Sequence, residues 1–163
     1  MKSMFVNRLN AHVGNADKTD IGVLLVGHGQ PDEWDKEFPT ETEQELSFRY
    51  DIIDLFVKEG YKKENLSLAW MEFKAPKVEE KIQEFVNKKI QKVYYFPAAI
   101  SADCIHTQID LPEQIARVDI PSDMEIVDLG GWNNDPIVIR AFKEKVDVYI
   151  GQYKDERLSG IQY

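Results

Sequence analysis

Three residues whose side chains could bind a metal ion or move a proton follow apolar segments of the chain: His28, Glu72 and His106. Two imidazoles and a carboxylate with open coordination positions suit iron, cobalt or nickel, and an imidazole can accept a proton near neutral pH. Each residue alone can also be a satisfied polar group at the end of a strand. Their shared position after a strand favours a common site.

The elements that would position these residues are apolar runs alternating with segments of helical period. The runs are Ile21–Val26, Leu66–Met71, Val93–Phe96 and Met124–Leu129. We expect them to be strands buried on both faces. Apolar stripes at helical spacing are Leu46, Tyr50, Ile53 and Val57, then Val78, Ile82, Phe85 and Val86, and finally Val138, Phe142, Val146 and Tyr149. Each stripe is expected to lie on the sheet.

This alternation predicts an α/β fold, a three-layer domain in which helices flank a central four-stranded parallel sheet. Ligands bind such sheets at the carboxyl ends of the strands, so the three polar residues should meet at one edge. A less regular helix is expected between Thr107 and Arg117, and Asp135 and Pro136 should begin the last helix. We expect a polar leader (residues 1–20), one domain (21–152) and a C-terminal tail (153–163).

The composition narrows the range of functions. With 20 Lys and Arg against 29 Asp and Glu, the net charge of −9 argues against a nucleic-acid partner. Residues 1–20 lack the continuous apolar stretch of a signal peptide, and the sequence has no run of about 18 apolar residues, so we expect no membrane partner and a cytoplasmic location. The single cysteine, Cys104, is interpreted as a small buried hydrophobe, with an auxiliary metal ligand as the alternative. His12 is expected at the surface.

The negative charge is concentrated after His28. Between Pro31 and Leu46 the chain has seven acidic residues and one basic residue, a net charge of −6. One interpretation is a solvated loop followed by the acidic first turn of a helix. The other is a group of acids that concentrates divalent cations beside a metal site.

Four stretches, in this order, resemble successive blocks of the class II chelatases, the family of the ferrochelatases and sirohydrochlorin chelatases. They are GVLLVGHGQ (22–30), LAWMEFKAPKVEEKI (68–82), VYYFPAAISADCIHTQIDLP (93–112) and LGGWNNDPIVIRAF (129–142). The chain is most similar to the small single-domain CbiX-type members, over about residues 21–150. The resemblance implies a chelatase-like fold with flavodoxin-like winding. It also implies a lyase that inserts Co²⁺, Fe²⁺ or Ni²⁺ into a tetrapyrrole such as sirohydrochlorin, in cobalamin, siroheme or heme-type biosynthesis.

Matched motif by motif, the resemblance implies that His28, Glu72 and His106 bind the metal or remove the pyrrole protons. It implies a substrate surface formed by Gly29, Gln30, Met71, Phe73, Ala99, Ile100 and Ser101. The metal ion is then a substrate, and no tightly bound cofactor is expected. Because the chain resembles one half of a two-domain ferrochelatase, we expect a homodimer.

The acidic GHGQPDEWDKEF segment departs from the small chelatases and is similar to the opening of ferrochelatases. It would repel a macrocycle with eight carboxylates more than a less acidic porphyrin. A non-catalytic carrier of metal or tetrapyrrole is an alternative with the same three residues. A histidine phosphatase is a further alternative, because LLVGHGQ differs by one residue from the LLVRHGQ pattern of that family. Gly27 stands there in place of the arginine that would bind phosphate.

Overall fold

The computed structural model describes residues 1–159, with the backbone alone for residues 39, 40 and 153–159. The chain divides into two compact units, Lys2–Asn133 and a second unit from Asn134 onward. Residues 160–163 of the expected tail lie outside the described residues.

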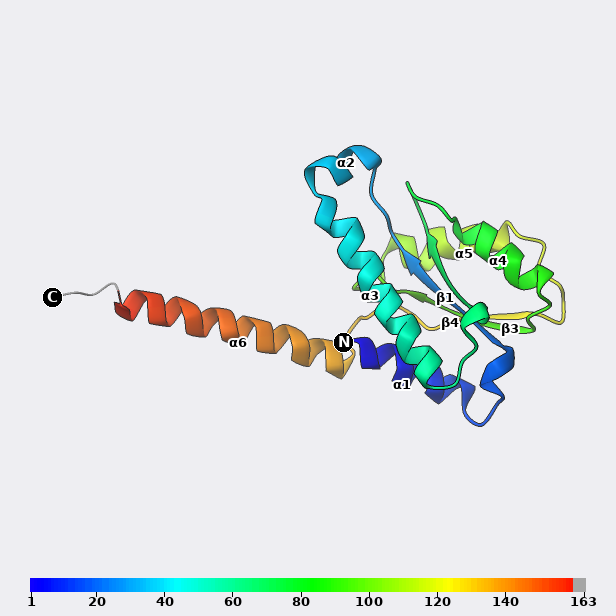
Figure 1. The fold of residues 1–163 in the computed structure, drawn as a ribbon, viewed down its shortest axis with the longest axis horizontal. Helices are drawn as coiled ribbons and strands as arrows, with labels where there is room; N and C mark the ends of the chain where they lie inside the picture. Colours follow the sequence, from blue (N-terminus) through cyan, green and yellow to red (C-terminus); the bar gives the residue numbers. More distant parts are fainter. Residues whose placement is uncertain (160–163) are drawn as a thin grey trace. The chain divides into compact units, whose positions relative to one another are not determined.

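The first unit is built on a four-stranded, all-parallel sheet (Figure 1). Its strands are β1 (Ile21–Gly27), β2 (Leu66–Trp70), β3 (Lys92–Pro97) and β4 (Glu125–Asp128). Their order is β2-β1-β3-β4, so the chain winds to one side of β1 and then crosses to the other. The predicted four-stranded parallel α/β fold with flavodoxin-like winding is therefore confirmed.

Helices cover both faces of this sheet. The helical elements of the unit are α1 (Lys2–Val13), η1 (Lys18–Asp20), α2 (Asp32–Glu37), α3 (Pro39–Lys58), η2 (Lys63–Asn65), α4 (Val78–Asn87), η3 (His106–Asp110) and α5 (Leu111–Ala116). On one face, α4 and α5 pack Ile82, Phe85 and Ile115 into a cluster with Leu24 and Val26 of β1. On the other face, α1 and α3 lie side by side (Figure 1).

An aromatic cluster packs α1 and α3 against the second face of the sheet. The ring of Phe96 in β3 lies 5.1 Å from the ring of Phe5 in α1 and 6.3 Å from that of Phe56 in α3, measured between centroids. All three side chains are buried. Strand β1 is buried throughout, as expected of a central parallel strand, whereas the edge strand β4 is partly exposed, contrary to the prediction of burial on both faces.

The buried face of α3 differs from the predicted stripe. Tyr50 and Val57 of that stripe are exposed, and the buried residues are Arg49, Ile52, Ile53 and Phe56. The inward face is thus rotated by about one residue. The pattern was misleading because a charged residue, Arg49, occupies the middle of the buried face.

The segment before Ile21, expected as a polar leader, forms α1 within the same unit as the sheet. Met4, Phe5 and Leu9 are buried on its inner side. From the same helix, Arg8 Nη1 donates hydrogen bonds to the carbonyls of Leu129 (2.8 Å) and Gly131 (2.7 Å), in the loop after β4. His12 is exposed, as expected.

The second unit contains α6 (Pro136–Ser159). Its start matches the prediction, since the Asp135 side chain accepts a hydrogen bond of 2.9 Å from the Ile137 N–H. The helix continues beyond residue 152, into the expected tail. Its stripe does not form the predicted buried face, because Phe142, Val146 and Tyr149 are exposed. No helix of the described residues is long and apolar enough to cross a membrane.

Candidate functional site

The site is built from the carboxyl ends of β1 and β2. Gly27 is paired with Trp70 in the parallel register, and the pairing continues past the strands. The Met71 N–H donates to the Gly27 carbonyl at 2.9 Å, and the Glu72 N–H donates to the His28 carbonyl at 3.0 Å. Backbone hydrogen bonding therefore holds Glu72 beside His28.

Gly29 makes this close approach possible. Its φ of +87° lies in the region that favours glycine, and a Cβ atom there would lie 2.5 Å from the Glu72 carbonyl oxygen. The glycine after His28 therefore has a steric role at the contact between the two loops. No larger residue fits without displacing the Glu72 backbone.

His106 reaches the same edge from the segment after β3. It begins η3, a π-helical turn in which the Leu111 N–H donates to the His106 carbonyl. Such turns are frequent at functional sites. The preceding loop is fixed at two points: Trp132 Nε1 donates to the Ala98 carbonyl, and the Asn133 N–H donates to the Ser101 carbonyl, both at 2.9 Å.

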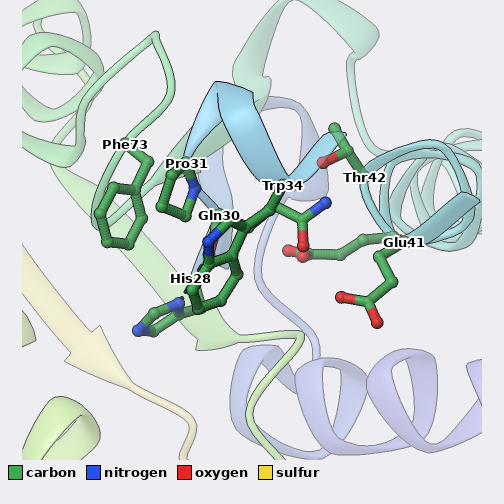
Figure 2. A pocket seen from close by; sticks show the side chains of 9 residues that line it. His28, Gln30, Pro31, Trp34, Glu41, Thr42 and Phe73 are labelled. Atoms are coloured by element: carbon green, nitrogen blue, oxygen red, sulfur yellow. Dashed lines mark hydrogen bonds between the residues drawn. The ribbon is translucent and has the colours of Figure 1, made fainter. Parts of the chain in front are cut away.

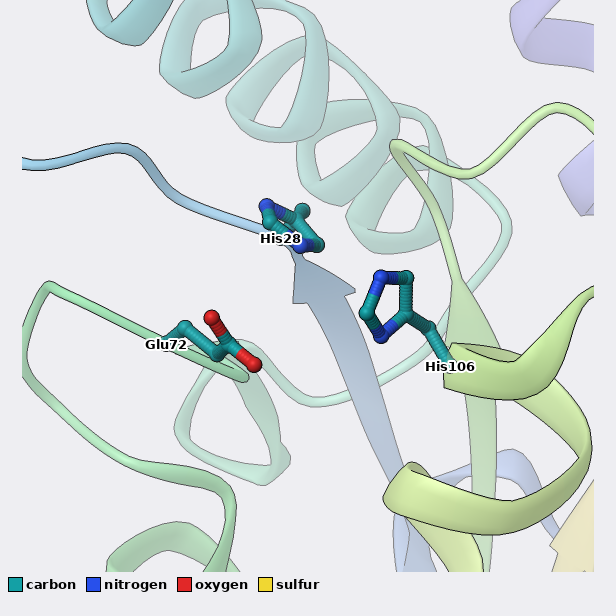
Figure 3. Close-up of side chains that lie close together, drawn as sticks. All are labelled: His28, Glu72 and His106. Carbon is teal, nitrogen blue, oxygen red and sulfur yellow. The ribbon is translucent and has the colours of Figure 1, made fainter.

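The structure brings His28, Glu72 and His106 together (Figure 3). One potential ligand atom from each lies within 4.8 Å of the other two, and the centroids of the two imidazole rings are 4.8 Å apart. In a tetrahedral site with bond lengths of about 2.0–2.2 Å, two ligands of one ion lie roughly 3.4 Å apart. The widest pair of these groups would therefore need to close by at most about 1.4 Å to share a cation.

Hydrogen bonds fix the orientation of both imidazoles. His28 Nδ1 lies 2.7 Å from the Gly29 carbonyl oxygen, and His106 Nδ1 lies 2.7 Å from Asp110 Oδ2. A carbonyl and a carboxylate only accept, so Nδ1 carries the proton in each ring. In the neutral imidazole this leaves the Nε2 lone pair free to bind a metal or to accept a proton.

A cavity of about 370 Å³ opens beside His28 (Figure 2). Its lining consists of His28, Gly29, Gln30, Pro31, Trp34, Glu41, Thr42, Glu45 and Phe73. Of the three clustered residues, only His28 contributes to this lining. Trp34 and Phe73 are 57% and 51% exposed, which leaves aromatic surface open at the cavity.

The expected substrate surface is thus only partly assembled. Gly29, Gln30 and Phe73 line the cavity, whereas Met71 is buried in the core between the sheet and α4. The alternation of side chains along β2 explains this placement, because Met71 points to the opposite side from its neighbours. In the loop after β3, Ala99 and Ser101 do not line the cavity, and Ile100 packs against the core.

Five cavity residues were not expected from the sequence: Pro31, Trp34, Glu41, Thr42 and Glu45. The three on α3 share one helical face, so their spacing was an available signal. The spacing of His106 and Asp110 also indicated a supporting carboxylate. Cys104, which is half-buried, does not belong to the metal-binding cluster among the described residues.

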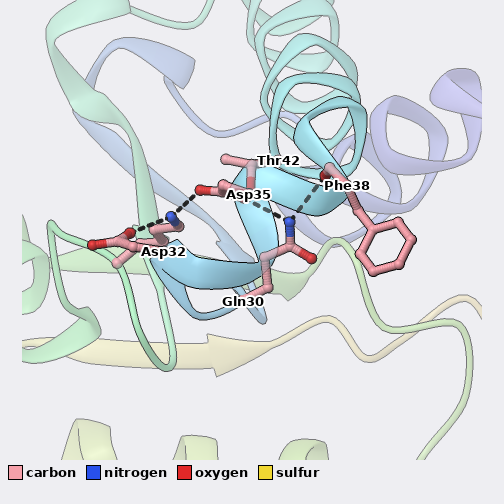
Figure 4. Close-up of polar contacts among 6 residues, drawn as sticks. Gln30, Asp32, Asp35, Phe38 and Thr42 are labelled. Atoms are coloured by element: carbon pink, nitrogen blue, oxygen red, sulfur yellow. Dashed lines mark hydrogen bonds and ion pairs between the residues drawn. The ribbon is translucent and has the colours of Figure 1, made fainter.

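The acidic segment is an ordered part of the site (Figure 4). Asp35 Oδ1 accepts hydrogen bonds of 2.6 Å from both Gln30 and Thr42, and Asp35 also pairs with Lys74. Lys74 Nζ further contacts Asp32 at 2.6 Å. The bond from Lys74, followed by those from Thr42 and Gln30, lowers the pKa of Asp35 to about 2. This network, the Asp35–Lys74 clamp, ties α2 to the loop after β2.

Two imidazoles and a carboxylate lie where the strand order reverses in a parallel α/β sheet, the place at which such sheets bind ligands, and this set of donors suits a transition metal. The model of the CbiX family matches residues 22–148. The chain therefore belongs to the CbiX family, which confirms its resemblance to the class II chelatases.

The fold is also that of a known CbiX structure. A CbiX protein from Marinobacter aquaeolei VT8, whose name refers to cobalamin (vitamin B12) biosynthesis, superposes with a TM-score of 0.53 at 19% identity. The match covers 81% of this chain and 98% of that one. No curated protein sequence matches this chain.

Proposed function

We propose that this protein is a metal chelatase that inserts Co²⁺, Fe²⁺ or Ni²⁺ into a tetrapyrrole such as sirohydrochlorin. The observation that carries the proposal is the convergence of His28, Glu72 and His106 at the carboxyl edge of the sheet. Membership of the CbiX family supports the reaction class.

The donor set suits a metal that must arrive and leave again. Two Nε2 lone pairs and one carboxylate can hold a dication while leaving coordination positions open, whereas a closed cage of four ligands would retain it. His28 and Glu72, joined through their backbones, would hold the cation on the β1 side. The macrocycle would approach from the open side.

His106 is the proposed proton acceptor. Metal insertion releases two pyrrole N–H protons. As the cation passes to the macrocycle, the freed Nε2 of the neutral His106 imidazole would take one of them, and the second would go to solvent. The Asp110 carboxylate, hydrogen bonded to Nδ1, would stabilise the imidazolium that forms. His28 has only a backbone carbonyl at the equivalent nitrogen, which offers weaker stabilisation of a positive ring.

The cavity beside His28 offers a place for part of the macrocycle. Trp34 and Phe73 present apolar rings there, and Glu41 and Glu45 lie along the same lining. Acids on the lining oppose a substrate with many carboxylates, although screening over about 8 Å softens that effect. Lys74 offsets part of the charge through Asp32 and Asp35. We therefore include less acidic porphyrins among the substrates to be compared.

The test is a turnover assay of the purified protein with Fe²⁺, Co²⁺ and Ni²⁺, each against sirohydrochlorin and protoporphyrin. Conversion of more than one macrocycle per protein, followed by the absorption change on metallation, is the expected result. Binding of one equivalent without release of metallated product would instead establish the carrier function.

The geometry argues against the histidine phosphatase alternative. The guanidinium of Arg49 lies beside Gly27, where that family would carry its arginine, but the Arg49 side chain has no exposed surface. It donates to backbone carbonyls and lies against Trp70. A guanidinium enclosed in this way cannot grip a phosphate group.

We also propose a homodimer, in which a second copy supplies the other wall of the substrate cleft. In α6, the residues Ile139, Phe142, Val146 and Tyr149 are exposed and follow the alternating spacing of three and four residues typical of paired helices. Sedimentation analysis should find a dimer. A fully active monomer would contradict the proposal.

A further inference from the structure

Arg49 is a buried cation directly below the site. Its side chain has 0% exposed surface, and Nη1 donates to the carbonyls of Ala69 at 2.7 Å and Leu25 at 3.4 Å. Its guanidinium lies 3.9 Å from the Trp70 ring centroid. These partners precede His28 and Glu72 by two or three residues each, so the positive charge lies next to the position proposed for a dication.

Glu45 is the acidic partner of this cation. Its Oε1 lies 3.5 Å from Arg49 Nη2 on the same helix, and Glu45 lines the cavity together with His28. Glu45 Oε1 is shielded from solvent and accepts no hydrogen bond, and the buried Arg49 Nη2 and Nε donate none. The contact is therefore chiefly one of opposite charge. A merely structural pair would be expected to satisfy its hydrogen bonds.

Gly27 allows both charges to reach the sheet edge. A Cβ atom at that position would lie 1.9 Å from Glu45 Oε1 and 2.7 Å from Arg49 Cζ. The glycine before His28 thus makes room for a charged pair rather than for a ligand.

We propose that Glu45 is a positioning residue for the metal substrate, because its carboxylate neutralises the buried charge of Arg49 and so permits a dication to bind at His28, Glu72 and His106. This inference rests on the proposed function and deepens it. Arg49 donates to the carbonyls of Leu25 and Ala69, and its charge would repel a cation if Glu45 did not offset it.

Burial shifts the pKa of both members of the pair. Burial lowers the pKa of Arg49 to about 10, which leaves the guanidinium charged at neutral pH. Burial raises the pKa of Glu45, while Arg49 and then His28 oppose that rise by favouring the carboxylate.

The test measures Co²⁺ binding by isothermal titration calorimetry on the full chain without a tetrapyrrole. Glu45→Gln should weaken binding by roughly ten- to hundredfold, because the Arg49 charge is left uncompensated. Arg49→Met should leave binding unchanged or strengthen it. The double variant should return to within about threefold of the wild type. Glu43→Gln, which removes an exposed acid from the same helix, is the matched control.

The signs of these effects separate charge balance from a structural role. The inference is overturned if both single variants weaken Co²⁺ binding, or if Glu45→Gln leaves binding unchanged. Failure of the wild type to bind Co²⁺ would overturn it too. Thermal melting of each variant identifies any that fails to fold, and Arg49→Met and the double variant then decide the outcome. Wild-type binding with the predicted order but no turnover would reject the chelatase proposal alone.

Discussion

The imidazole of His106 is held by the carboxylate of Asp110, with 2.7 Å between Nδ1 and Oδ2. Both residues belong to η3, and both side chains are about one-third exposed. The pair turns the Nε2 atom of His106 into a defined acceptor at the sheet edge. The orientation of this ligand is thus set within a single helical turn.

Asp110→Asn should keep the fold and weaken metal binding. An amide cannot match a carboxylate as a hydrogen-bond acceptor, and loss of such supporting groups typically costs 10–100-fold in affinity or activity. Calorimetric titration with Co²⁺ measures the effect. Glu113→Gln, an exposed acid in α5, serves as the control. Equal affinities of the two variants would remove Asp110 from the site.

His106→Ala should reduce the initial rate of metal insertion by about 10²–10⁴-fold, since the proposed proton acceptor is lost. The measurement is the rate of metallated product formation at saturating metal. His12→Ala, which alters an exposed histidine in α1, should retain the wild-type rate. An unchanged rate in His106→Ala would exclude this residue from the mechanism.

Trp34→Ala should raise the KM for the tetrapyrrole by about tenfold and leave kcat nearly unchanged, because stacking of an aromatic ring on a flat macrocycle is worth about 1–2 kcal/mol. Steady-state kinetics at fixed metal separate the two constants. Phe38→Ala is the matched control, because Phe38 is an exposed aromatic of the same segment that does not line the cavity. A similar KM for both variants would argue against stacking on Trp34.

Phe73→Asn should stabilise the protein by about 1 kcal/mol while weakening tetrapyrrole binding. Phe73 has a φ of +56°, a conformation that costs a bulky residue about 1–2 kcal/mol and that Asn adopts more readily. Its ring is half-exposed, so little burial is lost. Denaturant unfolding and substrate titration test the two effects. A variant that is destabilised, or that binds substrate normally, would contradict this prediction.

The Asp35–Lys74 clamp should respond to pH in a defined direction. The pKa of Asp35 is lowered from 3.8 to about 2, so the clamp contributes its full stability above pH 4 and loses it as the pH falls towards 2. Asp35→Asn should therefore melt at a lower temperature than the wild type at neutral pH. The difference should disappear near pH 2. A constant difference across this range would assign the effect to something other than the charge.

Much of the fold was accessible to pattern arguments because β1 is apolar throughout and the helices between strands carry clear stripes. The convergence of His28, Glu72 and His106 followed from one rule about parallel sheets. The buried face of α3 could not be predicted from its apolar spacing, because Arg49 occupies an inward position that sequence patterns assign to apolar residues.

The cavity was harder to predict than the cluster. It depends on where α2 and α3 lie after His28, and the Asp35–Lys74 clamp joins segments 39 positions apart. Sequence spacing does not encode such tertiary pairing. The family resemblance implied that Met71 belongs to the substrate surface, whereas the structure buries its side chain in the core between the sheet and α4.

The hydrogen bonds from Arg8 also bear on how the protein is made. Arg8 in α1 is synthesised 121 residues before Leu129, whose carbonyl accepts its hydrogen bond. The aromatic cluster around Phe5 likewise waits for β3. During translation, the inner side of α1 can pack on α3 first but lacks β3 and the loop after β4 until those segments have emerged, so part of its apolar surface stays exposed in the meantime.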